Sequence, residues 1–160
     1  MRKVLLVLAF CGFAASLWAA DPIIGTWKLN IAKSKFGPGV QATMKEQTNT
    51  LRELTVDQCE LAITGIGTNG SPYSMKLTFP VQGGGPAVVT AQPPAIAEGV
   101  SVVVTFVEPG NWYFTDLKNG KQVAVAHVVV SKDGKSALET NRSTDATGKT
   151  TEQLLVYDKQ

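Results

Sequence analysis

Four short connections, each containing glycine, divide the second half of the sequence and constrain its fold more than any other feature. Glycine and asparagine adopt the positive φ angles of tight hairpin turns at little cost. The segments between the connections are short and rich in valine, threonine and aromatic residues, which favour strands. The pattern therefore predicts consecutive antiparallel strands joined by hairpins. The connections read EPGN, KNGK, SKDGKS and DATGK, over residues 108–111, 118–121, 131–136 and 145–149.

The first half of the sequence follows the same plan less regularly. Tyr73, Met75, Leu77 and Phe79 alternate with polar residues, which is the period of a strand with one buried face. No segment combines a helical period with capping residues. The prolines in VQGGGP and QPPAIAEG predict loops there, because proline cannot donate a hydrogen bond to a sheet. We expect strands over residues 23–30, 42–51, 60–66, 73–79, 87–91, 100–107, 112–117, 122–130, 137–143 and 150–157, with 87–91 a short edge strand.

A meander of this length leaves two unpaired edges unless it closes on itself. Closure into a barrel pairs the edges and encloses the hydrophobic face. We therefore predict an all-β fold, a single antiparallel up-and-down β-barrel of about eight to ten strands. The strand over residues 23–30 is expected to pair with a strand near the end of the chain.

The sequence opens with a segment that has the pattern of a secretory signal peptide. Arg2 and Lys3 precede an apolar run over residues 4–15, and small residues follow. The alternative is an uncleaved membrane anchor, but the run is short for a bilayer span and no basic stop-transfer segment follows it. Cleavage is expected after Ala19 or Ala20. The expected division is a signal peptide over residues 1–20 and a barrel domain over residues 21–160 of a secreted or periplasmic protein, with no membrane span after cleavage.

Cleavage leaves a domain without net charge. The chain has 15 basic and 13 acidic residues, and the loss of Arg2 and Lys3 makes the two sets equal. No run of lysine and arginine remains, so we expect no nucleic-acid partner. Cys59 is the one cysteine after the leader, which excludes a disulfide within the domain. We expect a monomer whose stability comes from its hydrophobic core.

Two blocks at the ends of the domain resemble a known family. GTWKLNIAKSKFGPG, over residues 25–39, places Trp27 two residues after a glycine, and the second block combines SKDGK over 131–135 with VYDKQ over 156–160. Together they resemble secreted bacterial lipocalin-like proteins of the calycin type. The resemblance implies a barrel whose first-strand tryptophan closes the floor, with a basic side chain from a late strand over its ring. It implies these roles for Trp27 and Arg142, and a turn off the floor for the Lys/Ser/Pro/Gly run that follows.

One nucleotide-binding motif is matched by its letters alone. Residues 65–70 read GIGTNG and fit G-x-G-x-x-G after a strand. A dinucleotide site also needs a helix that opens at the third glycine, but Ser71, Pro72 and an alternating strand follow here. We interpret the segment as a glycine-rich hairpin and expect no cofactor. Cys59 lies near Asp57, and because a nearby acid does not activate a thiol, we expect no cysteine nucleophile.

Polar residues share strand faces with apolar ones in two places. Glu139 and Asn141 lie on one face of a strand, and Asp116 lies on one face of another with Trp112 and Phe114. Either set would place polar groups among apolar neighbours, as a ligand cavity does, but alternation alone does not say which face is inside. Carboxylates on strands are usually solvated, so we expect no catalytic residue and no enzyme activity.

His127, the only histidine, shares strand parity with Val123, Val125 and Val129. The simpler interpretation is a histidine among valines on one barrel face. The alternative is a hydrogen-bonding or pH-sensitive group inside a cavity. No cluster of histidine, cysteine or carboxylate residues accompanies it, so no metal site is expected.

These observations favour a binding protein, an exported lipocalin-like barrel that holds a small hydrophobic or amphipathic molecule. The alternative is a ligand-free structural or protein-interaction barrel filled by its own side chains. Small residues opposite the aromatic ones would leave room for a ligand, whereas large residues in every layer would fill the barrel. The candidate ligand-binding residues are Tyr73, Met75, Leu77, Phe79, Trp112, Phe114 and His127.

Overall fold

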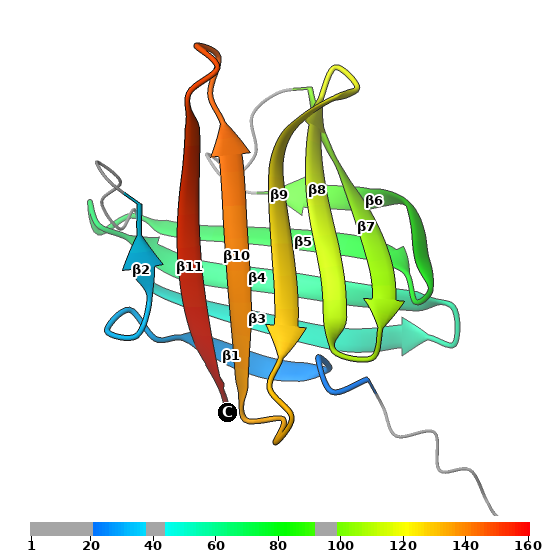
Figure 1. Ribbon diagram of the computed structural model, residues 1–160. Coiled ribbons are helices and arrows are strands. Elements are labelled where there is room, and N and C mark those ends of the chain that lie inside the picture. Colours follow the sequence, from blue (N-terminus) through cyan, green and yellow to red (C-terminus); the bar gives the residue numbers. More distant parts are fainter. Residues whose placement is uncertain (1–20, 38–43, 92–98) are drawn as a thin grey trace, which may run out of the picture.

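The strands of the computed structural model form a barrel of two crossing layers. The structure describes residues 21–37, 44–91 and 99–160. The strands are β1 (Gly25–Leu29), β2 (Lys35–Phe36), β3 (Met44–Thr55), β4 (Gln58–Gly67), β5 (Pro72–Pro80), β6 (Gly83–Ala91), β7 (Val100–Glu108), β8 (Asn111–Lys118), β9 (Lys121–Val130), β10 (Ser136–Thr144) and β11 (Thr150–Lys159). In Figure 1, β7–β11 run upright in the front layer, and β1 and β3–β6 lie behind them.

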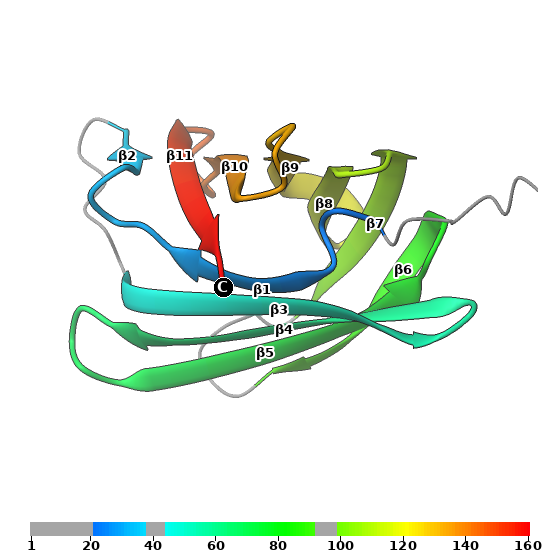
Figure 2. The same ribbon diagram turned by 90° about the horizontal axis from the view of Figure 1, so that it is seen from below.

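The sheet closes on itself through its first and last strands. From β3 to β11, each strand pairs with the next one along the chain, while β1 pairs with β3 on one side and with β11 on the other. The β1–β11 register sets Trp27 opposite Lys159 and Leu29 opposite Tyr157. Figure 2 shows β1 passing below the end of β11, between the two layers. The prediction of an all-β, antiparallel up-and-down barrel, with its first strand paired near the end of the chain, is confirmed.

The glycine-containing connections form the tight turns that the sequence predicts. Asn119 and Gly120 join β8 to β9 with φ angles of 52° and 76°. Two consecutive positive φ angles are the signature of the type I′ turn, whose twist matches that of the flanking strands. The GTNG segment between β4 and β5 is likewise a hairpin turn, as the sequence predicts for this glycine-rich stretch.

The segment VQGGGP does not break the chain as expected. β6 begins at Gly83, contains Pro86, and pairs with both β5 and β7, so it is not an edge strand. Its pairing with β5 involves only residues 88–91. Pro86 therefore lies where β6 is unpaired on the β5 side, and this local edge accommodates a residue that has no N–H group.

The Lys/Ser/Pro/Gly run after Trp27 forms more than the predicted turn. Lys35 and Phe36 form β2, which pairs with β11. The Ser34 hydroxyl accepts a hydrogen bond from the backbone N–H of Val156 at 3.0 Å. β1 and β2 thus follow one another along the same edge of β11 and together cover most of its length.

One end of the barrel is filled by a hydrophobic core. Phe79 and Trp112 are only 1% and 2% exposed. The ring of Phe79 packs edge-on against Trp112 at 6.0 Å and against Phe114 at 5.9 Å. Trp112 Nε1 donates to Asp21 Oδ2 at 3.1 Å, and Asp21 Oδ1 accepts from the N–H of Gly110 at 2.8 Å. Asp21 therefore ties the segment before β1 to the turn between β7 and β8.

The predicted signal peptide over residues 1–20 lies outside the described residues. So do residues 92–98 of the QPPAIAEG segment and residues 38–43 of the connection before β3. In the part of the chain that the structure describes, there is no helix with the length and hydropathy needed to span a bilayer.

Candidate functional site

A cavity of about 190 Å³ lies between the two layers, above the filled core. Strands of both layers contribute to its wall. Most of its lining side chains are aliphatic or aromatic, and they include Leu51, Leu61, Ile63, Met75, Leu77 and Phe114. A mostly apolar cavity with a few polar groups is typical of a small-molecule site.

The cavity exists because one wall is built from small side chains. Ala124 and Ala126 of β9 and Ala137 of β10 face it, while Met75 and Leu77 of β5 contribute larger side chains. A methyl group at each of these alanine positions leaves space that a leucine or valine would fill. Small residues share the lumen with large ones, which is the arrangement expected of a hollow barrel rather than a filled one.

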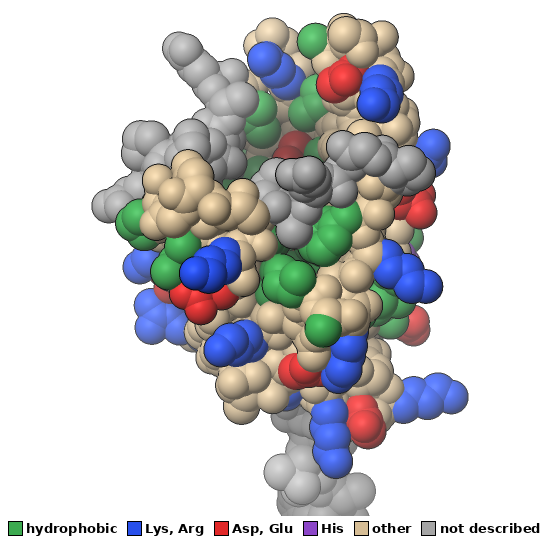
Figure 3. All heavy atoms as spheres, turned by 90° about the vertical axis from the view of Figure 1, so that its left-hand side faces the viewer, with side chains coloured by type: hydrophobic (Ala, Val, Ile, Leu, Met, Phe, Trp, Pro, Cys, Tyr) green, Lys and Arg blue, Asp and Glu red, His purple; other side chains and the backbone are tan. Residues whose placement is uncertain are grey.

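A second, more open pocket of about 540 Å³ adjoins the cavity at the other end of the barrel from the filled core. It is lined by Met44 and by the hairpin between β4 and β5, and it shares Ile63 and Met75 with the inner cavity. Figure 3, which views the side on the left of Figure 1, shows a hollow with hydrophobic side chains and an acidic side chain at its depth. The two pockets together give the cavity a route to the surface.

The polar side chains of the inner cavity come from four strands. Among the described residues that line it, the charged ones are Asp116 of β8 and Glu139 of β10, and Asn49, Asn141 and Tyr157 add amide and hydroxyl groups. Asp116 and Glu139 lie on opposite sides of β9, whose inward residues are apolar. The alternation of residues left open which of these two polar strand faces is inside the barrel. Both faces line the cavity among apolar neighbours.

A chain of hydrogen bonds leads from the outer pocket to Glu139. The Tyr73 hydroxyl donates to Gln47 Oε1 at 2.8 Å, and Gln47 Nε2 donates to the Tyr157 hydroxyl at 2.9 Å. Tyr157 in turn hydrogen-bonds to Glu139, which also accepts from Asn141 Nδ2 at 3.3 Å. These contacts hold the carboxyl in place within the wall of the cavity.

Both cavity carboxyls have raised pKa values. Burial raises the pKa of Asp116. Burial is also the main cause of the raised pKa of Glu139, to which the charge of Asp116 adds, while hydrogen bonds from Asn141 and Tyr157 act in the opposite direction. Burial, and then the charge of Glu139, hold the pKa of Tyr157 well above its ordinary value. The interior of the barrel therefore disfavours negative charge, because the described lining residues supply no cation to balance it.

We expect Glu139→Gln to stabilise the unliganded protein at about pH 8 and to have a smaller effect at about pH 4. A carboxyl whose pKa is raised on folding binds its proton more tightly in the folded state, so stability falls as the pH rises through the raised value. Glutamine keeps the acceptor oxygen and carries no charge at any pH. Urea unfolding at both pH values measures the difference.

The matched control for this prediction is Glu152→Gln, which removes an exposed carboxylate from β11. This variant changes the net charge equally but removes no buried charge. An equal gain from both substitutions, or a gain from Glu139→Gln that is larger in acid, would contradict the assignment.

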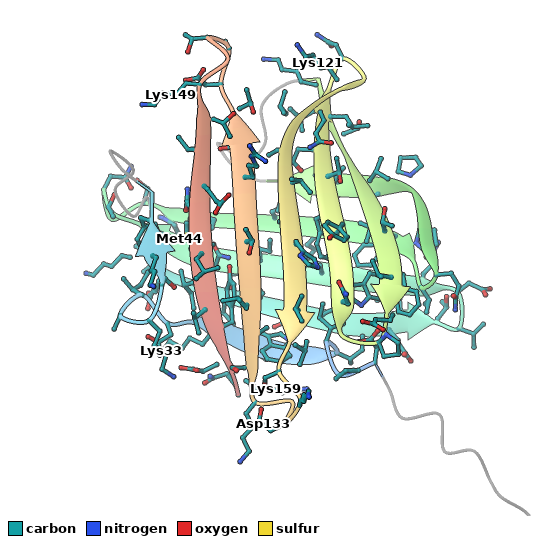
Figure 4. All side chains as sticks on the ribbon, viewed as in Figure 1. Lys33, Met44, Lys121, Asp133, Lys149 and Lys159 are labelled. Carbon is teal, nitrogen blue, oxygen red and sulfur yellow. The ribbon has the colours of Figure 1, made fainter. Side chains whose placement is uncertain are left out.

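Trp27 closes the floor of the barrel, with a different cation from the one expected. Its side chain is 4% exposed, and Nε1 donates to the carbonyl of Ile23 at 2.7 Å. Lys159 Nζ lies 4.9 Å from the ring centroid and donates to the carbonyl of Pro22 at 3.0 Å. Figure 4 shows Lys159 at the lower end of the barrel, away from Met44. The floor is thus built from the segment before β1 and the last residues of β11.

The assignment of Arg142 to the floor is wrong. Arg142 lies opposite Glu152 in the β10–β11 register, seven residues along β11 from Lys159, and its side chain is exposed. Glu139 and Asn141 of β10 face the cavity, and the alternation of the strand therefore turns the next residue, Arg142, outward. The cation over Trp27 comes instead from the residue directly opposite it in the β1–β11 register.

The seven predicted ligand-binding residues are divided among four environments. Met75, Leu77 and Phe114 line the inner cavity, and Tyr73 lines the outer pocket with Met75. Phe79 and Trp112 belong to the filled core below the cavity. His127 is on the outer face of β9 and does not contact either pocket.

The placement of His127 in the lumen is therefore wrong. Its ring stacks on Tyr113 with centroids 4.1 Å apart and an interplanar angle of 3°, and its Nε2 is 2.8 Å from Asn111 Oδ1. The inward residues on either side of it are Ala126 and Val128, so the bulkier alternate residues of β9 point outward. The described residues contain no group of three or more His, Cys, Asp or Glu side chains that could hold a metal.

Sequence reasoning missed the polar end of β3. Gln47 and Asn49 contribute to the hydrogen-bond chain, and they share a strand face with the buried Leu51. That parity is the signal that would have placed them inside.

Cys59 is buried and unreactive. Its side chain is 1% exposed, and burial, followed by the charges of Glu53 and Asp21, raises its pKa to about 11. The thiol therefore stays protonated near neutral pH and is a core residue.

No family model matches the sequence, and no curated protein matches it. Among solved structures, the wild-type fluorescent protein UnaG superposes with a TM-score of 0.59 at 14% identity. The superposition covers 89% of this chain and 100% of the UnaG chain. An asparagine-to-alanine mutant of UnaG gives a TM-score of 0.59 at 16% identity, covering 89% of this chain and 99% of its own. At such identities the likeness concerns the fold alone. The chain is similar to these proteins as a closed, lipocalin-like β-barrel.

Proposed function

We propose that this protein is an exported barrel that binds a small hydrophobic or amphipathic molecule inside its lumen. The observation that carries the proposal is the apolar cavity behind the alanines of β9 and β10, which opens through the pocket at Met44. A barrel that served only as a scaffold would gain stability from filling this space, since buried voids cost stability. Retaining it is consistent with a ligand that occupies it.

Binding rather than catalysis is part of the same proposal. Glu139 is held by hydrogen bonds, both cavity carboxyls lie among apolar neighbours, and Cys59 is protonated and buried. Export rests on the signal-peptide pattern of residues 1–20. Sequencing the N-terminus of protein recovered outside the cytoplasm tests export, and an intact leader on all of the protein would contradict it.

We expect Ala126→Phe to weaken the binding of an uncharged hydrophobic dye, N-phenylnaphthylamine, by about tenfold or more, equivalent to about 1.4 kcal/mol. The new ring points into the cavity from β9 and occupies the space the dye needs. Fluorescence titration of the folded protein at neutral pH measures the affinity. The unsubstituted protein should bind the dye saturably.

Val125→Phe is the matched control, because Val125 is the neighbouring residue on β9 and does not line the cavity. It adds a ring of the same size to the outer face and should leave dye affinity unchanged. Saturable binding that both variants lose equally would place the dye on the surface. An absence of dye binding to the unsubstituted protein would favour the filled, ligand-free barrel.

A further inference from the structure

The charges of the lumen have one sign. Asp116 and Glu139 are the charged residues of the inner cavity, and neither it nor the outer pocket is lined by lysine, arginine or histidine among the described residues. The nearest basic group of the floor, Lys159, is held over the ring of Trp27 and donates to Pro22. An anionic headgroup entering this lumen would meet two carboxyls and no cation.

The two carboxyls frame an open space. They lie on β8 and β10, with β9 between them. Asp116 is opposite Ala124 of β9 and Glu139 is opposite Val128, so the two residues are separated by two strand spacings across the sheet and by four residues along it. The charge of Asp116 still acts on Glu139 across this space. The inward residues of β9 near them are Ala124, Ala126 and Val128, none of which has a polar side-chain atom. The wall between the two carboxyls is therefore apolar, and β9 contributes no polar side chain that would compete for a ligand.

Neither carboxyl has a basic partner within the described residues. The ion pairs there join Lys33 to Asp158 and Arg52 and Lys76 to Glu60, all away from the cavity lining. Asp116 lines the cavity. Its carboxyl oxygens are not fully buried atoms without a hydrogen-bond partner. They are available to a molecule that enters it.

Burial of a carboxylate without a cation is unfavourable, and a cation brought by a ligand relieves that cost. Burial raises the pKa of both Asp116 and Glu139, which shows that the barrel itself does not supply the compensating charge. A ligand ammonium group would donate to the two carboxyls. Asn141, whose amide N–H is already engaged by Glu139, retains an oxygen that can accept a further hydrogen bond.

We propose that the ligand is an amphipathic amine, whose protonated amino group lies between Asp116 and Glu139 and whose hydrophobic body lies along Met75, Leu77 and Phe114. This inference rests on the proposed function, since it names the class of molecule that the cavity takes. Charge complementarity selects the headgroup, and the apolar wall selects the body.

Three eight-carbon ligands that differ in their headgroup test the proposal: octylamine, octanol and octanoate. Each is titrated against bound N-phenylnaphthylamine at neutral pH and low salt. We expect octylamine to displace the dye at a concentration at least about tenfold lower than octanol does, and octanoate to be the weakest. Octanoate competing as well as octylamine would overturn the proposal.

The variant Asp116→Asn combined with Glu139→Gln removes both charges and keeps the shape of the side chains. It should weaken octylamine binding by about tenfold or more while leaving octanol binding unchanged. Glu152→Gln, with its exposed site on β11, is the control and should leave all three affinities as they are. An equal loss of all three ligands in the double variant would show a packing role for the carboxyls and contradict the proposal.

The outcomes separate the two proposals. If the dye and octanol bind but octylamine binds no better than octanol, the lumen is a binding site and the amine assignment is wrong. If the dye and all three ligands fail to bind the unsubstituted protein, the proposed function itself is wrong.

Discussion

Trp27→Ala is expected to lower the free energy of unfolding by about 3–5 kcal/mol, as for other truncations of large buried aromatic side chains. The indole is 4% exposed and packs at the floor of the barrel, where it also borders the cavity. Its removal loses the hydrogen bond to the Ile23 carbonyl and leaves Lys159 without the ring beneath it. Urea unfolding followed by far-ultraviolet circular dichroism measures the change.

Two substitutions at exposed positions are controls for Trp27→Ala. Lys28→Ala removes the next side chain of β1, which is exposed, and should cost less than about 1 kcal/mol. Arg142→Ala removes the cation that the family resemblance assigns to the floor, and its exposed position should make the effect as small. A loss of less than about 1 kcal/mol for Trp27→Ala would show that the floor is peripheral to stability.

Trp112→Ala should have an effect of the same size, about 3–5 kcal/mol, at the filled core. The ring contacts Phe79 at 6.0 Å and Phe106 at 5.0 Å between centroids. Its N–H also donates to Asp21, which links the segment before β1 to the β7–β8 turn. The substitution therefore opens a void and loosens that link at the same time.

Trp112→Phe separates the two contributions. It keeps an aromatic ring in the core but removes the donor to Asp21, so we expect a smaller loss, about 1–3 kcal/mol. Thr115→Ala, on the outer face of the same strand, controls for strand propensity and should cost less than about 1 kcal/mol. Equal losses from Trp112→Ala and Trp112→Phe would mean that the hydrogen bond alone accounts for the effect.

The strands were predictable where turn chemistry marked their ends. The connection at Asn119 and Gly120 needed two positive φ angles, and those residue types signalled it. β6 was harder, because Gly83 and Pro86 have the composition of a loop. A strand tolerates a proline where the neighbouring strand does not extend far enough to pair with it. How far β5 extends along β6 is set by tertiary structure and not by the local sequence.

The site was predictable as a set of strand faces but not as an interior. On β5 one face is clearly apolar, so Met75 and Leu77 were placed correctly beside the cavity. Both faces of β9 are apolar, and the larger valines with His127 suggested the wrong one. A hollow barrel turns its alanines inward because they leave space, which reverses the usual preference for burying the bulkier side chain.

The partner of Trp27 depended on a register between distant strands. The resemblance supplied a basic residue on a late strand, and two late strands, β10 and β11, carry one. Lys159 was selected by its position opposite Trp27 in the closing pair. A slip of one residue would have turned it to the other face, and nothing local in either strand reports that choice.

The closing pair also orders the events of folding. Along β3–β11 every pairing joins strands adjacent in the chain, whereas the seam between β1 and β11 brings together residues such as Asn30 and Asp158, which are 128 positions apart. The entropy lost on closing a loop increases with its length, and contacts of high sequence separation slow folding. The hairpins are therefore expected to assemble first and the seam last, so the lumen is complete only in the final step. A molecule bound in that lumen would leave the refolding rate almost unchanged and act instead by slowing the opening of the native barrel.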